Sequence, residues 1–110
     1  MQRPVTPELA ELIAQRFRVI GDPTRIRILD LLRDGERTVG EITLALGTSQ
    51  QNASKHLGVL LQAGIVARRK EGTSARYSVA DPGVFELCEQ VCGGLRAQLD
   101  EVRQILDDAA

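Results

Sequence analysis

The chain has 110 residues and a formal net charge of −1; 43% of its residues are hydrophobic, but only three are aromatic. This length suits one domain with a modest, largely aliphatic core. No run of about 18 apolar residues occurs, which excludes a predicted membrane-spanning helix, and the N-terminus lacks the apolar core of a signal peptide. We therefore expect a cytoplasmic protein whose two cysteines remain thiols.

Three signals predict where helices begin. Each combines an N-cap residue with a proline at the first helical position, at residues 6–7, 22–23 and 81–82. Apolar residues then recur at helical spacing. The sequence therefore predicts helices from residue 7 to about 20, from 23 to about 33, and from about 82 to 106.

The middle of the chain predicts a helix-turn-helix followed by a hairpin. A capping box at Thr38 and Glu41 opens a short helix that Gly47 ends. Thr48 or Ser49 caps a further helix that runs to about residue 63, and two helices joined by such a tight glycine turn are typical of a helix-turn-helix. Residues 65–70 and 76–79 read as two strands around a turn. The predicted fold is mainly α with a small β-hairpin: four helices, the hairpin and a last helix, in one domain over residues 1–110.

Charge is segregated along the chain. Residues 1–47 are neutral overall, residues 48–79 carry +4 and residues 80–110 carry −5. A basic middle segment favours a local contact with a polyanion, even in a chain that is acidic overall.

The polar start of the helix over 48–63 is the strongest indication of function. In a helix-turn-helix the second helix enters the major groove of DNA. Gln and Asn bond adenine, and Lys bonds guanine or phosphate. The basic hairpin would act as a wing that reaches the backbone or the minor groove. The predicted DNA contacts are Thr48, Ser49, Gln50, Gln51, Asn52, Ser54, Lys55, His56, Arg68, Arg69, Lys70, Thr73, Ser74 and Arg76. The alternative for the helix alone is an ordinary solvated face.

Two segments, FRVIGDPTRIRILDLL (17–32) and LGTSQQNASKHLGVLLQAGIVARRKEGTSARYSV (46–79), strongly resemble the ArsR/SmtB family of winged-helix repressors. The match is carried by Gly-Asp-Pro-Thr-Arg at 21–25, by Ser54-x-His56-Leu57-x-x-Leu60 and by Ala-Gly-Ile-Val at 63–66. The resemblance covers nearly the whole chain. It implies a homodimer built on the first and last helices, and repression at an inverted-repeat operator that an inducer relieves.

His56 is the only histidine. It would contact a phosphate, or it would bond the nearby backbone and fix the helix; we favour the second. As a metal ligand it has no second histidine to act with.

Cys88 and Cys92 lie four residues apart in the last helix, so they share one face. The family's usual Cys-x-Cys and acidic-histidine metal sites are absent from this sequence. The two thiols would bind a soft ion such as arsenite, Cd(II), Cu(I) or Zn(II), or they would be oxidised; a three-thiolate arsenite site would need a sulfur from the partner chain. The alternative is that Cys88 and Cys92 pack as small core residues. The repressor would then be regulated by a non-metal signal or a protein partner.

Gly93-Gly94 follows Cys92 directly and predicts either close helix contact or a bend.

A thiol enzyme is disfavoured, because Cys-x-x-x-Cys is not the Cys-x-x-Cys spacing of dithiol oxidoreductases and no acid-base pair or phosphate loop occurs. A winged helix that binds a protein instead of DNA is the third interpretation.

Overall fold

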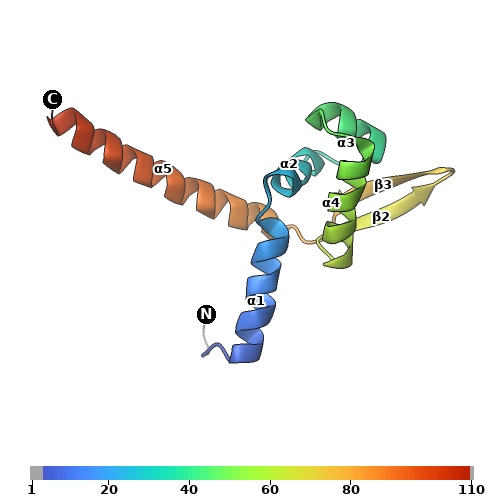
Figure 1. Ribbon diagram of the computed structural model, residues 1–110, viewed down its shortest axis with the longest axis horizontal. Helices are drawn as coiled ribbons and strands as arrows, with labels where there is room; N and C mark the ends of the chain where they lie inside the picture. The colour runs from blue at the N-terminus through green and yellow to red at the C-terminus, as the bar shows by residue number, and fades with distance from the viewer. Residues whose placement is uncertain (1–3, 110) are drawn as a thin grey trace.

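The computed structural model describes residues 4–109. Its elements follow in the order α1 (Pro7–Ile20), α2 (Pro23–Leu32), β1 (Arg37–Thr38), α3 (Val39–Leu46), α4 (Gln50–Gln62), β2 (Val66–Glu71), β3 (Ser74–Val79) and α5 (Gly83–Ala109). Figure 1 shows α2, α3 and α4 gathered beside the β2–β3 hairpin, while α5 projects away from them. All five predicted helices are confirmed.

Local capping explains where the helices start. Thr6 Oγ1 accepts a hydrogen bond from the amide of Leu9, and Asp22 Oδ1 accepts from the amides of Thr24 and Arg25. Thr38 and Glu41 form the predicted capping box. Each bond satisfies an amide that has no partner inside its helix, so these starts are set by the local sequence.

The sheet differs from the expected hairpin because it has three strands, in the order β1-β3-β2. β1 is only two residues long and pairs antiparallel with β3, with Arg37 opposite Tyr77 and Thr38 opposite Arg76. A two-residue strand has no alternating pattern for a sequence to show. Its pairing therefore depends on the packing of α2 and α3, and the prediction of a hairpin alone was wrong on this point.

The wing turn is tighter than predicted. Glu71 pairs with Ser74, which leaves a two-residue loop of Gly72 and Thr73. Gly72 has φ +63°, whereas no residue other than glycine has positive φ within residues 4–109. Glycine at the first loop position and negative φ at the second match a type II′ turn, whose twist suits a hairpin.

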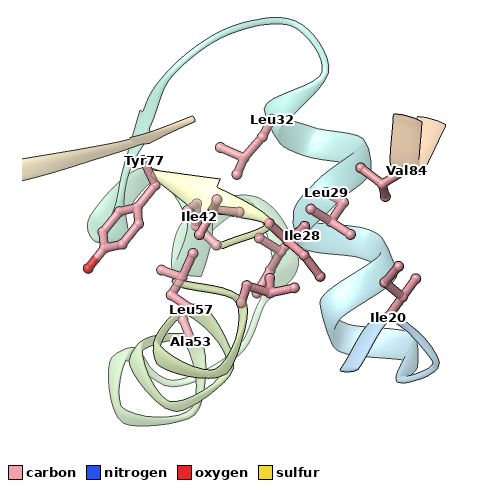
Figure 2. Packing of buried hydrophobic residues seen from close by; sticks show 12 residues of the cluster. Ile20, Ile28, Leu29, Leu32, Ile42, Ala53, Leu57, Tyr77 and Val84 are labelled. Atoms are coloured by element: carbon pink, nitrogen blue, oxygen red, sulfur yellow. The ribbon is translucent and has the colours of Figure 1, made fainter. Parts of the chain in front are cut away.

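The core lies between α2, α3, α4 and the sheet (Figure 2). Ile28, Ile42, Leu57, Leu60 and Ile65 are fully buried in it. α1 and α5 contribute little: within the described residues, Ile20 is the only buried residue of α1 and Val84 the only one of α5. The core therefore fixes the helix-turn-helix and leaves the two terminal helices largely uncovered.

The molecule is elongated for its size. Its radius of gyration is 17.6 Å, whereas a compact chain of this length has about 13 Å. The excess comes from α1 and α5, which both project from the body (Figure 1). In residues 4–109 no helix has the length and apolar character needed to cross a membrane.

Candidate nucleic-acid interface

α4 has a polar outer face and an apolar inner face. The inner residues Ala53, Leu57 and Leu60 are completely buried and anchor the helix in the core. The outer residues Gln50, Gln51, Ser54 and Lys55 are exposed. The helix is thus held rigidly from behind while its first two turns face solvent, which is the arrangement that a base-reading helix requires.

Three of the predicted DNA-contact residues, Thr48, Ser49 and Asn52, already have partners at the start of α4. Ser49 Oγ caps the helix by accepting from the amide of Asn52 at 3.0 Å. Asn52 Nδ2 donates to Thr48 Oγ1 at 2.8 Å, and both side chains are half-buried. These contacts fix the conformation of the first turn of α4. Among the exposed polar residues of its first two turns, no side-chain hydrogen bond to the described residues 4–109 is made by Gln50, Gln51, Ser54 or Lys55.

His56 points into the protein. It is 7% exposed, and its Nδ1 lies 3.1 Å from Nη1 of Arg25 on α2 and 3.8 Å from Oδ1 of Asp22. We expected a bond to the nearby backbone; the partner is instead a side chain 31 residues away. The ring therefore serves the scaffold behind the helix in this structure, and a phosphate contact by His56 stays a prediction.

The four cations of the wing fall into two groups. Arg69 donates to both carboxylate oxygens of Glu36, at 2.8 and 3.2 Å, and to Glu71 at 3.1 Å. Arg76 lies 3.7 Å from Glu41 and 3.8 Å from Glu71. Arg68 and Lys70 are exposed and have no acidic partner in the part of the chain that the structure describes. The uncompensated charge of the wing therefore belongs to Arg68 and Lys70.

The Arg69–Glu36 pair joins the wing to the corner before α3. The hydrogen bond from Arg69 lowers the pKa of Glu36, and the same bond raises the pKa of Arg69. Both groups therefore stay charged near neutral pH. Because both side chains are open to solvent, solvent screens the pair, and it contributes little to the stability of the fold.

The wing turn and the start of α4 lie next to each other. Gln50 of α4 and Thr73 and Ser74 of the turn line one hollow of about 380 Å³, together with residues 38–40. Ser74 Oγ donates to the carbonyl of Glu71 at 3.1 Å. Segments more than 20 residues apart in the chain thus line one hollow.

The two thiols lie at the edge of an apolar groove between α1, α2 and α5. Cys88 is half-buried and Cys92 is exposed, and the groove, of about 370 Å³, is also lined by Phe17, Ile20, Gly21, Ile26, Leu87, Val91 and Leu95. Arg96 Nη2 lies 3.9 Å from Cys92 Sγ. Within residues 4–109 no three His, Cys, Asp or Glu side chains are close enough to share a metal ion. One protomer therefore offers two sulfur ligands.

α5 runs without interruption through Gly93 and Gly94. A Cβ atom at either glycine would meet nothing within 4 Å. The helix is therefore not broken at these glycines, and both a bend and close contact with a second helix stay predictions.

A helix-turn-helix core flanked by a β-wing defines a winged helix-turn-helix protein. A family model described as a helix-turn-helix domain matches residues 20–69. The chain is 39% identical over 101 residues to the uncharacterised HTH-type transcriptional regulator Rv0081 of Mycobacterium tuberculosis, covering 91% of this chain and 89% of that protein. The crystal structure of the same regulator superposes with a TM-score of 0.78 at 38% identity, over 87% of this chain and 97% of that one.

A second solved structure is a homodimeric winged helix-turn-helix DNA-binding domain of Mycobacterium bovis, titled a possible ArsR-family transcriptional regulator. It matches with a TM-score of 0.71 at 34% identity, over 92% of this chain and 95% of that one. The chain also shares 43% identity over 74 residues with a probable mercury resistance operon repressor of Streptomyces lividans, which is 67% of this chain and 59% of that protein. The chain belongs to the ArsR/SmtB family of winged-helix transcriptional regulators, which are DNA-binding proteins and not enzymes.

Proposed function

We propose that the chain is a repressor that binds an inverted-repeat operator as a homodimer and leaves it when an inducer binds. The observation that carries this proposal is the shared surface of α4 and the wing. Gln50, Thr73 and Ser74 line one hollow, and the free cations Arg68 and Lys70 precede the turn on the same hairpin. A base-reading helix thus lies beside a phosphate-binding wing. Such a repressor must be in the compartment that contains its operator DNA, which agrees with the cytoplasmic location expected from composition.

The exposed apolar residues of α5 support the homodimer. Beyond the body, Leu95, Leu99, Val102 and Leu106 are between 49% and 67% exposed. With Cys88 and Cys92 they recur at alternating spacings of four and three residues, the repeat of a helix that packs along a second helix. Leu12 and Phe17 of α1 are also more than half exposed. A second copy would cover both helices and place two α4 helices about one DNA turn apart.

The division of roles between α4 and the wing is testable on DNA recovered by selection from random sequences. Replacing both Arg68 and Lys70 by Ala should weaken binding to every sequence. It should also reduce the slope of log K against log salt by about 0.9 for each phosphate that the variant no longer neutralises. Gln51→Ala should leave that slope unchanged and relax the preference at one base pair of each half-site by about 1–3 kcal/mol.

Arg69→Ala is the matched control for the wing, because Glu36 and Glu71 already hold this cation. We expect Arg69→Ala to lose less affinity for DNA than Arg68→Ala or Lys70→Ala does when each is made alone. Identical salt slopes and identical base preferences for the Gln51 and wing variants would overturn the assignment of roles. Retention of sequence-specific binding by all of them would favour a surface for a protein partner.

Cys88 and Cys92 supply the inducer site in this proposal. Their spacing of one helical turn allows two thiolates to approach one soft ion, and their place in the α5 stripe would bring the partner's two thiols close. A relative named for mercury resistance supports a metal response. The chain's own ion remains within the thiophilic class that includes arsenite, Cd(II) and Zn(II), and oxidation of the thiols is the competing signal.

Operator release should depend on the thiols. Wild type should leave the selected DNA on addition of one of Hg(II), arsenite, Cd(II), Zn(II), peroxide or polysulfide, as followed by fluorescence anisotropy. The Cys88→Ser, Cys92→Ser double variant should bind the DNA equally well and should stay bound in the presence of the same agent. If every agent acts equally on both proteins, the cysteines are packing residues and the signal is of another kind.

A further inference from the structure

Two arginines connect α1 to the recognition helix α4. Arg16 of α1 donates to the carbonyl of Ala63, which caps the C-terminal end of α4, and to Asp81 Oδ2, both at 2.6 Å. Arg25 of α2 donates to the carbonyls of Val19 and Arg18 at the end of α1 and directs Nη1 to His56 in the middle of α4. α4 is therefore tied to α1 at two points along its length.

Apolar contact between α1 and α4 is limited on its outer side. A hollow of about 370 Å³ that is open to the surface lies beside the contact, lined by Leu12, Gln15, Arg16, Val19 and Ala63, and Leu12 is 65% exposed. The arginine bonds therefore add to the packing that orients α1 against α4.

The Arg25–His56 contact specifies the protonation of the imidazole. A guanidinium only donates hydrogen bonds, so the Nδ1 atom that faces it must accept. That requires a neutral ring with its proton on Nε2. Asp22 Oδ1 lies further away, at 3.8 Å, and already accepts from the amides of Thr24 and Arg25.

We propose that Arg25 and His56 are positioning residues that couple the self-association helix α1 to the orientation of α4. The coupling rests on the proposed dimer and its DNA binding. The exposed face of α1 that a second copy would cover carries Leu12 and Phe17. The carbonyls that Arg25 holds follow directly at residues 18 and 19. A shift of α1 against its partner would move Arg25, and through His56 it would rotate α4 relative to the groove.

Two substitutions at His56 separate this role from simple space filling. The Oδ1 atom of His56→Asn takes the place of Nδ1 and keeps an acceptor for Arg25, whereas the amide of His56→Gln takes the place of Nε2 and does not. We expect His56→Gln to bind the selected DNA at least about tenfold more weakly than His56→Asn does, a difference of about 1.4 kcal/mol or more. Amide NMR shifts of residues 18–21 should move in His56→Gln and stay in His56→Asn.

The imidazole of wild type gives a measurement that needs no variant and no DNA. Nitrogen-detected NMR should show an unprotonated Nδ1 and a protonated Nε2. A protonated Nδ1, or equal effects of the Asn and Gln variants on residues 18–21, would overturn the coupling. If wild type binds no DNA, but its imidazole has the expected tautomer and the two variants have the expected amide shifts, the proposed function is refuted. The link between α1 and α4 would then still stand.

Discussion

Leu57→Ala is expected to lower the free energy of unfolding by about 2–5 kcal/mol and to weaken operator binding at physiological temperature. Leu57 is completely buried under α4, and truncating a buried leucine removes its transfer free energy and leaves a cavity. For a domain of this size the total stability is about 5–15 kcal/mol, so the loss is a large fraction of it. Urea denaturation followed by circular dichroism measures the change.

Leu44→Ala is the matched control. Leu44 lies on α3, in the same helix-turn-helix, but is 86% exposed. The same chemical change should alter stability by no more than about 0.5 kcal/mol. Equal destabilisation by the two substitutions would contradict the placement of α3 and α4 around the core.

Leu95→Glu combined with Leu99→Glu is expected to convert the proposed dimer into a folded monomer. Both side chains are more than half exposed on α5 in a single protomer, so two carboxylates there cost little in the isolated chain but are unfavourable in an apolar helix seam. Val84 is the one buried residue of α5 among those described, and it lies outside the substituted stretch. The helical content should therefore persist while the mass in sedimentation equilibrium halves.

Loss of the dimer should weaken operator binding by about a hundredfold or more, because the second half-site no longer binds within the same complex. Ala97→Glu is the control, since residue 97 lies on the opposite side of α5 from the Leu95–Leu99 stripe. It should remain dimeric and bind DNA as wild type does. A dimer that survives the double substitution would show that α5 is not its seam.

The local parts of this fold are predictable from sequence, and the long-range pairings are not. N-caps at Thr6, Asp22 and Thr38 act within three or four residues, so the helix starts follow from short segments. β1 and the Arg69–Glu36 bond join residues that only the packed core brings together, 33 positions apart in the second case.

The same distinction holds for the candidate DNA interface. The exposed outer face of α4 follows from helical periodicity, and the structure places Gln51 and Lys55 on it as expected. Sequence spacing treats the four wing cations alike, whereas the tertiary contacts of Arg69 and Arg76 separate them from Arg68 and Lys70. His56 carries no local signal for Arg25, because the two lie on different helices and meet only after α2 and α4 pack.

Two copies of α4 are expected to read one symmetric operator. Hydroxyl-radical footprinting of wild type on the DNA recovered by selection tests this expectation. We expect a twofold-symmetric footprint with two protected half-sites whose centres lie about one helical turn apart. A single asymmetric protected patch, or a selection that recovers no preferred sequence, would contradict it.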